Sequence, residues 1–170
     1  YEFPVHHFSP THCARTKDLF NEALKFQKMG GSVDITSGGS KFAPLHEVVA
    51  YGLENGLNLE RLTMSSDGNG SVPKFNENGE LVGYGCASCA SNLEVLQALV
   101  RNKILKIEDT LALMSKNVAR YLNLSQKGEI KVGNDADLCV FDEELNLYDV
   151  IAKGEFCVKD EKVVKKGFFE

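Results

Sequence analysis

Residues 62–71 read Leu-Thr-Met-Ser-Ser-Asp-Gly-Asn-Gly-Ser, and the interpretation of the whole chain starts from them. A short apolar, β-prone run leads to the carboxylate of Asp67, and glycines follow at once. Parallel strands of α/β barrels present catalytic side chains in this way, where each strand passes into a loop. The alternative is an ordinary strand and turn, in which Asp and Asn act as turn formers. This segment alone leaves both interpretations open.

A second segment, residues 8–15, reads Phe-Ser-Pro-Thr-His-Cys-Ala-Arg. Residues 5–8 are predicted to be a strand, and His12 and Arg15 stand just beyond its end. A lone His after a strand is more often structural than functional. His12, however, shares its topological position with Asp67, and a metal site or a catalytic pair is assembled from the ends of different strands in such folds.

Hydrophobic spacing predicts three strand-and-helix units followed by a region of short strands. The units pair strand 5–8 with helix 18–29, strand 33–37 with helix 43–55, and strand 62–67 with helix 91–101. Helices are predicted at 107–114 and 118–122, and strands at 137–141, 146–152, 155–159 and 162–165. We therefore divide the chain into residues 1–126 and 127–170.

The segment between the third strand and its helix is predicted to be a functional loop. Residues 68–85 are rich in Gly, Asn and Lys, and they follow the strand that carries Asp67. Ser91 or Asn92 is predicted to cap the next helix. The Cys-x-x-Cys at 86–89 has no second cysteine pair to complete a zinc site. We therefore interpret these cysteines as small side chains that pack at the start of the helix.

Composition is typical of a folded protein: 43% of the 170 residues are hydrophobic and 25% are charged. The net charge of −5 makes nucleic acid an unexpected partner. No apolar run approaches the ~20 residues of a membrane-spanning helix, and no signal peptide is visible. The number of cysteines is odd, five, which suits free thiols better than a disulfide framework, so we expect a cytoplasmic protein.

Three motifs give the chain a resemblance to a known family. Residues 9–15 (Ser-Pro-Thr-His-Cys-Ala-Arg), 31–37 (Gly-Ser-Val-Asp-Ile-Thr-Ser) and 65–75 (Ser-Ser-Asp-Gly-Asn-Gly-Ser-Val-Pro-Lys-Phe) resemble bacterial isoaspartyl dipeptidases (β-aspartyl peptidases). Residues 127–130 and 133–138 resemble the tail of the wider amidohydrolase superfamily. Ala14 departs from the family, where a polar residue is usual, and so does Phe168, where Thr is usual.

The resemblance implies the fold class. It is α/β, the C-terminal part of a metal-dependent hydrolase (β/α)8 TIM barrel with part of a small β-sandwich domain. A complete barrel needs ~250 residues, so we expect the earlier strands outside this chain, which begins at Tyr1. The first strand would then expose an edge, and we expect a homo-oligomer.

The resemblance also implies the chemistry, which is hydrolysis of β-aspartyl dipeptides by a metal-activated water. His12 would bind one of two zinc ions. Asp67 would bind the other, accept the proton of the nucleophile and pass it to the leaving amine. Arg15 and Ser71 would hold the dipeptide substrate.

The remaining zinc ligands, a His-x-His pair, a carboxylated lysine and a further His, are absent from the sequence. We therefore expect the 170 residues alone to be inactive. His6, His7 and His46 are interpreted as structural.

Two other functions remain open at this point. Another amidohydrolase, such as a dihydroorotase-like or N-acyl amino acid hydrolase enzyme, would share His12 and Asp67 without needing Arg15. A non-catalytic scaffold that has lost its metals is the second alternative.

Overall fold

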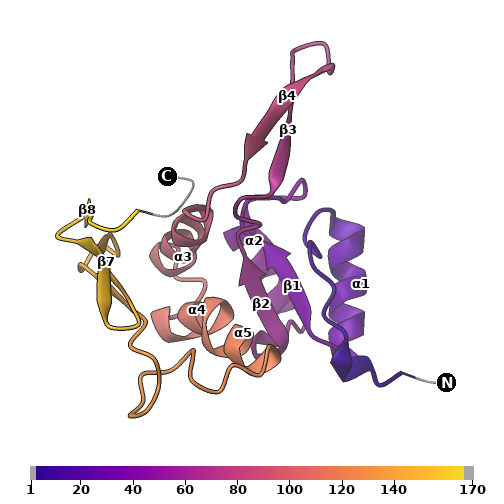
Figure 1. The fold of residues 1–170 in the computed structure, drawn as a ribbon. Coiled ribbons are helices and arrows are strands. Elements are labelled where there is room, and N and C mark those ends of the chain that lie inside the picture. The colour runs from indigo at the N-terminus through magenta and orange to yellow at the C-terminus, as the bar shows by residue number, and fades with distance from the viewer. Residues whose placement is uncertain (1–2, 167–170) are drawn as a thin grey trace. The chain divides into compact units, whose positions relative to one another are not determined.

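A pair of parallel strands, β1 (Val33–Thr36) and β2 (Leu62–Ser65), lies at the centre of the first of two units in this computed structural model (Figure 1). The structure describes residues 3–166, and the units comprise residues 3–118 and 119–166. The fold is mixed α/β. The domain division at residue 126 stays a prediction.

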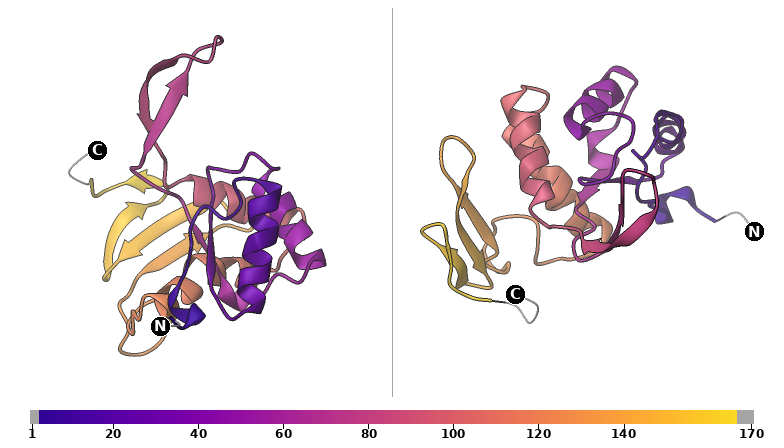
Figure 2. Two further views of the ribbon diagram at one scale, coloured as in Figure 1. Left: turned by 90° about the vertical axis from the view of Figure 1, so that its right-hand side faces the viewer. Right: turned by 90° about the horizontal axis from the view of Figure 1, so that it is seen from above.

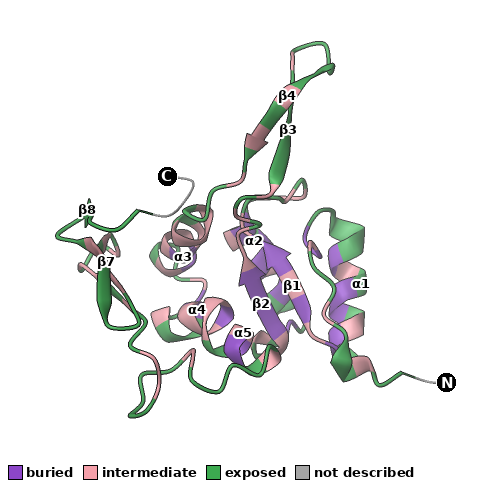
Figure 3. Ribbon diagram, in the orientation of Figure 1, coloured by how far each residue is buried: buried purple, intermediate pink, exposed green. Residues whose placement is uncertain are grey.

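Most residues of both strands are buried (Figure 3), and one face of the pair is apolar. Val33 pairs with Leu62 and Ile35 with Met64, and these four side chains are at most 2% exposed. Side chains alternate along a strand, so the residues between them point to the opposite face. Those residues are polar in both strands: Asp34, Thr36, Thr63 and Ser65. The pair therefore separates an apolar core from a polar surface.

Three helices cover the apolar face and stand side by side in Figure 2 (right). They are α1 (Lys17–Lys28), α2 (Leu45–Glu54) and α3 (Ser91–Arg101). Thr16 begins α1 by accepting a hydrogen bond from the Leu19 N–H. Tyr51 of α2 donates to Asn21 of α1 at 2.8 Å. The predictions of these helices at 18–29, 43–55 and 91–101 are confirmed to within two residues at each end.

Two buried amides fix the start of β2. Gln27 of α1 donates to the carbonyls of Asn58 and Arg61 and accepts from the Asn58 N–H at 3.0 Å. Asn117 donates to the carbonyls of Leu59 and Leu62 at 2.7 and 2.8 Å. Both amides thus hold the backbone of η2 (Leu59–Arg61), the 3-10 turn that leads into β2.

Two further helices complete the first unit and lead into the second. These are α4 (Ile107–Met114), which packs against β2, and α5 (Lys116–Tyr121), which contains Asn117. The prediction at 107–114 is confirmed, and the helix predicted at 118–122 begins two residues earlier.

The predicted strand at 5–8 is wrong. Val5–His7 form a 3-10 turn, η1, which starts at Pro4 and is closed by the bond from the His7 N–H to the Pro4 carbonyl. The extended segment comes later. The Pro10 carbonyl accepts from Asp34, and Cys13 donates back to the Asp34 carbonyl at 3.1 Å. Pro10 has no N–H of its own, so the segment follows β1 without forming a regular ladder.

The loop predicted at 68–85 is also corrected, because most of it is a β-hairpin. Strand β3 (Ser71–Phe75) pairs antiparallel with β4 (Leu81–Cys86), and the hairpin extends away from β1 and β2 (Figure 1). The side chain of Asn76 accepts the N–H groups of Asn78 and Glu80 and closes the turn. An Asn-Gly pair at 78–79 flanked by β-prone residues is the signal for this hairpin.

The predicted cap of α3 is wrong as well. Ala90 occupies the N-cap position without a side-chain cap, and Ser91 is already inside the helix. The hydroxyl of Ser91 donates to the Ser88 carbonyl, while the Ser88 hydroxyl accepts from the Ala90 N–H at 3.1 Å. Ser88 therefore organises this turn, three residues before the helix begins at Ser91.

The second unit is an antiparallel sheet in the order β5-β6-β7-β8. The strands are β5 (Leu138–Phe141), β6 (Leu147–Ala152), β7 (Glu155–Lys159) and β8 (Lys162–Val163), close to the predicted ranges. Lys127 forms ion pairs with Asp135 and Asp137 beside the sheet. Within residues 3–166, no helix is long and apolar enough to cross a bilayer.

Candidate active site

His12 lies in the turn that follows the extended segment beside β1. The Cys13 N–H after it is bonded to the Asp34 carbonyl, and the Arg15 N–H donates to the His12 carbonyl at 3.1 Å. The Nδ1 atom of His12 is 2.8 Å from the hydroxyl of Thr36, a buried residue at the end of β1. This bond occupies one ring nitrogen and leaves Nε2 available for a metal or another partner.

Asp67 faces His12 from the turn that follows β2. Its Oδ2 atom lies 3.8 Å from the Nε2 atom of His12, and the side chains are 56% and 26% exposed, respectively. Gly70 lies directly against Asp67, because a Cβ at Gly70 would be 2.8 Å from the Asp67 carbonyl oxygen. The Gly70 N–H donates to that same oxygen at 2.9 Å. The structure thus brings together the two residues that the sequence analysis named from separate segments.

The donor set of this pair suits a divalent metal. Imidazole nitrogen and carboxylate oxygen are zinc ligands, and a ligating His commonly has its other nitrogen held by a protein group, as Thr36 holds His12. In residues 3–166, no cluster of three or more His, Cys, Asp or Glu side chains is arranged to hold a metal. His12 and Asp67 therefore fit as part of a ligand set.

Arg15 and Ser71 are both exposed, on the segments that carry His12 and Asp67. Within residues 3–166, the Arg15 side chain makes no hydrogen bond or ion pair. Ser71 is the first residue of β3 and stands opposite Cys86 in the hairpin register. Both side chains are thus accessible to a ligand.

Sequence reasoning missed two polar residues of β1 beneath the candidate pair. Thr36 orients His12, and the carboxylate of Asp34 accepts hydroxyl groups from Thr11, Thr63 and Ser65. The available signal was a charged residue between Val33 and Ile35, in the middle of an apolar strand. A charge in such a position requires partners.

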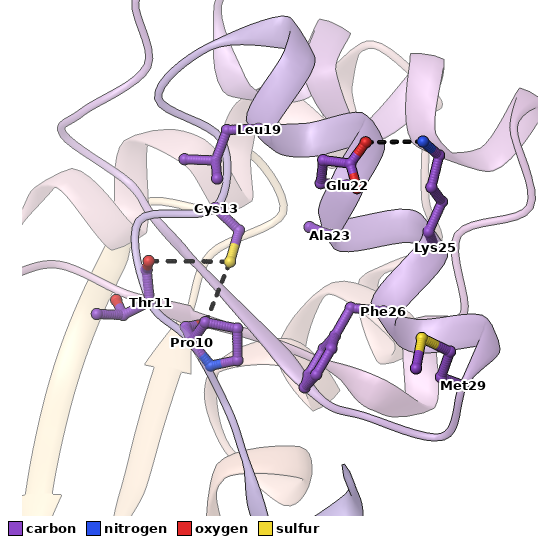
Figure 4. Close-up of a pocket in the computed structure, with 9 residues that line it drawn as sticks. All are labelled: Pro10, Thr11, Cys13, Leu19, Glu22, Ala23, Lys25, Phe26 and Met29. Atoms are coloured by element: carbon purple, nitrogen blue, oxygen red, sulfur yellow. Dashed lines mark hydrogen bonds and ion pairs between the residues drawn. The ribbon is translucent and has the colours of Figure 1, made fainter.

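A cavity of about 350 Å³ lies elsewhere, between α1 and residues 10–13 (Figure 4). It is lined mainly by apolar side chains of α1 and by Cys13, whose thiol donates to the Pro10 carbonyl at 3.2 Å. Burial raises the pKa of the Cys13 thiol above its ordinary value. The candidate residues His12, Arg15, Asp67 and Ser71 do not line this cavity, so it is separate from the pair.

The other histidines and the Cys-x-x-Cys pair are not part of the His12–Asp67 site. His6 and His7 are exposed and contact each other, and His46 is half-buried in α2. Cys86 and Cys89 are free and exposed. Gly68 leaves room for the Cys89 sulfur, since a Cβ there would be 2.3 Å from it. This contact supports packing of small residues before α3.

A comparison with protein families matches residues 9–168 to the model described as the amidohydrolase family. Among solved structures, a β-aspartyl dipeptidase from the thermophilic keratin-degrading Fervidobacterium islandicum AW-1, in complex with a β-Asp-Leu dipeptide, is 36% identical with a TM-score of 0.82. The alignment covers 98% of this chain and 43% of that one. A second structure of a β-aspartyl dipeptidase from this bacterium is 30% identical, with a TM-score of 0.77 and coverage of 99% and 42%.

A more distant match is the N-acetylglucosamine-6-phosphate deacetylase of Thermotoga maritima. It is 19% identical with a TM-score of 0.57, and the match covers 75% of this chain and 39% of that one. At this identity the likeness concerns the fold alone. This chain spans less than half the length of each of these three solved structures.

Proposed function

Because this chain belongs to the amidohydrolase family, we propose that it supplies part of an active site for metal-dependent hydrolysis of β-aspartyl dipeptides. The observation that carries the proposal is the approach of His12 Nε2 to Asp67 Oδ2, at 3.8 Å, across two segments. The 36% identity to a dipeptidase bound to β-Asp-Leu supports the substrate class.

Within this proposal, His12 and Asp67 are ligands of two different zinc ions, and further ligands come from outside these 170 residues. Divalent ions in such a site supply Lewis acidity for the scissile carbonyl and lower the pKa of a water molecule. Thr36 keeps the His12 ring in one orientation through Nδ1, so that Nε2 points towards Asp67. The imidazole is therefore already oriented before the metal binds, and metal binding does not have to order it.

Asp67 has a second role as the acid and base of the reaction. Its carboxylate accepts a proton from the attacking water and then delivers it to the nitrogen of the leaving amine. A carboxylate that is 56% exposed at the end of a buried strand can reach a substrate while its backbone stays fixed. The close packing of Gly70 on the Asp67 carbonyl limits movement of that backbone.

Arg15 and Ser71 bind the substrate in this proposal. A β-aspartyl dipeptide carries a free α-carboxylate on its aspartyl residue, and a guanidinium can bind a carboxylate with two parallel hydrogen bonds. Arg15 is exposed on the same turn as His12, and its guanidinium has no partner among residues 3–166. Ser71 offers a hydroxyl donor four residues after Asp67.

The proposal has a structural and a cellular part. We place β1, β2 and their helices in a (β/α)8 barrel and β5 to β8 in a small β-sandwich, both completed by residues outside this chain. A cytoplasmic location and a homo-oligomeric assembly belong to the same proposal.

The test is hydrolysis of β-Asp-Leu and α-Asp-Leu by the natural protein that contains these residues, loaded with zinc. We expect a preference of roughly 100-fold or more for β-Asp-Leu, because a site built to pair with one carboxylate rejects a substrate that presents it elsewhere. Equal rates on both dipeptides would reject the substrate class. Turnover of dihydroorotate or of N-acyl amino acids alone would favour another amidohydrolase, and no turnover of any substrate would favour a scaffold.

A further inference from the structure

The carboxylate of Asp34 connects three segments at the polar face of β1 and β2. Its Oδ2 atom accepts the hydroxyl of Thr11 at 2.8 Å and that of Ser65 at 2.7 Å, and its Oδ1 atom accepts the hydroxyl of Thr63 at 2.8 Å. Three hydroxyl donors thus converge on one acidic group. An ionised carboxylate is an acceptor only, so it suits three donors at once.

Two of these donors are next to the candidate pair in sequence. Thr11 directly precedes His12, and Ser65 lies two residues before Asp67. Both hydroxyls donate to the Oδ2 atom of Asp34, so this atom joins the segment of Thr11 to the segment of Ser65. Through this atom, the turn of His12 is linked to the end of the strand that carries Asp67.

The backbone of Asp34 holds the His12 segment from both sides. Its N–H donates to the Pro10 carbonyl at 2.9 Å, and its carbonyl accepts the Cys13 N–H at 3.1 Å. His12 lies between these two attachments. A single residue of β1 therefore binds the His12 turn by main chain and side chain, while β1 itself is in register with β2.

We propose that Asp34 is the positioning residue that sets the distance between His12 Nε2 and the Asp67 carboxylate. The role rests on the proposed function for its purpose, namely to prepare two ligands that approach each other at 3.8 Å. Asp34 acts through Thr11 and Ser65 and does not itself touch the metals or the substrate. Groups that orient metal ligands typically change metal affinity or activity by about 10–100-fold when they are removed.

The experiment measures zinc affinity by competition with a chromophoric chelator, alongside kcat and KM for β-Asp-Leu, in the natural protein. Thr11→Val, Ser65→Ala and Asp34→Ala are each expected to lower zinc affinity about 10–100-fold. At saturating zinc, kcat should fall by a similar factor, since a small misplacement of reacting groups is costly, while KM changes less than about threefold. The control is Thr110→Val, which removes a fully buried hydroxyl bonded only to the carbonyl of Lys106, the N-cap residue of α4.

A double variant tests whether Thr11 acts through Asp34. Asp34→Ala with Thr11→Val should be no worse than Asp34→Ala alone, because residues in one network are not additive. Asp34→Asn should retain much of the zinc affinity, since its amide oxygen can take the place of Oδ2 and keep Thr11 and Ser65. Fully additive losses, or an Asn variant as poor as the Ala variant, would overturn the assignment.

Removal of Asp34 leaves three hydroxyls without their acceptor, and Asp34→Ala can unfold the protein for that reason. Thr11→Val and Ser65→Ala then decide, because each removes a single bond. Zinc affinity equal to that of the natural protein in both would overturn the proposal. Loss of zinc affinity in a protein that hydrolyses no β-aspartyl dipeptide would support the positioning role and reject the proposed function. Turnover of β-Asp-Leu with zinc affinity unchanged in these variants would support the proposed function and reject the positioning role of Asp34.

Discussion

The strands before and after Asp67 differ in burial and in strand pairing. Strand β2, before it, is buried from Leu62 to Met64 and is paired with β1 over its whole length. Strand β3, after it, is exposed at all five positions and pairs only with β4 (Figure 3). The hairpin also carries large apolar side chains in contact with water, among them Phe75 and Tyr84 at 60% and 65% exposure.

This difference shows which side of Asp67 holds it in place. Strand β2 packs in the core, and its start is held by the side-chain amides of Gln27 and Asn117. Its last residue, Ser65, is bonded to Asp34. These contacts set the position of the Asp67 carboxylate. The hairpin side contributes little burial, because all five residues of β3 are exposed.

The largest effect is expected at the boundary itself. Asp67→Asn keeps the shape of the side chain but removes the group that accepts and returns the proton. We expect kcat for β-Asp-Leu to fall roughly 10²–10⁴-fold, with a smaller change in KM. Steady-state kinetics of the zinc-loaded natural protein measures both. Near-normal kcat with zinc bound would remove Asp67 from the acid and base role.

A matched pair of leucines compares the two strands directly. Leu62 of β2 is fully buried, and Leu62→Ala should lower the free energy of unfolding by about 2–5 kcal/mol. Leu81 of β4 is 50% exposed, and Leu81→Ala should change it by less than about 0.5 kcal/mol. Urea unfolding followed by circular dichroism gives both values. Equal losses would mean that the hairpin is buried in the natural assembly.

The clamp at the start of β2 has an intermediate effect. Gln27→Leu removes three hydrogen bonds, so the Asn58 N–H and the carbonyls of Asn58 and Arg61 lose the bonds that the buried Gln27 side chain makes with them. The free energy of unfolding should fall by about 1–3 kcal/mol, and Asn117→Leu should behave alike from the opposite side. Full stability in both variants would show that water replaces the amides and that the clamps do not fix β2.

The Arg15→Lys variant tests the proposed contact between Arg15 and the substrate carboxylate. Arg15→Lys keeps the charge but cannot reproduce the planar, two-pronged contact with a carboxylate. KM for β-Asp-Leu should rise roughly tenfold, equivalent to about 1.4 kcal/mol, with stability unchanged because the side chain is exposed. An unchanged KM would remove Arg15 from the substrate-binding role.

The smallest effect belongs to the hairpin. Val82 is 63% exposed, so Val82→Ser should change the free energy of unfolding by less than about 0.5 kcal/mol and leave kcat for β-Asp-Leu as it is. The same urea and kinetic measurements apply. A larger loss of stability that depends on protein concentration would indicate that the hairpin is covered in an oligomer.

The strand and helix pattern was predictable because β1, β2 and the covering helices follow simple hydrophobic periods. The turn at Val5–His7 was not, because the β-prone Val5 and Phe8 suggest a strand while Pro4 starts a tight turn. The hairpin was missed because its composition is that of a loop, although the Asn-Gly pair at 78–79 is a turn signal.

The candidate pair of His12 and Asp67 was named from the sequence, since each residue follows an extended segment. Asp34 was not, because its role depends on three hydroxyls that meet only in the folded chain. Thr11, Thr63 and Ser65 come from two segments about 50 residues apart in the sequence. No local pattern shows that their hydroxyls share one carboxylate.

The position of zinc in crystals of the natural protein, from anomalous diffraction at the zinc edge, tests the roles of His12 and Asp67 most directly. We expect two peaks, one about 2.0–2.1 Å from His12 Nε2 and the other about 2.0–2.2 Å from the Asp67 carboxylate. Zinc bound elsewhere, with both side chains beyond coordination distance, would contradict the assignment of His12 and Asp67 as metal ligands.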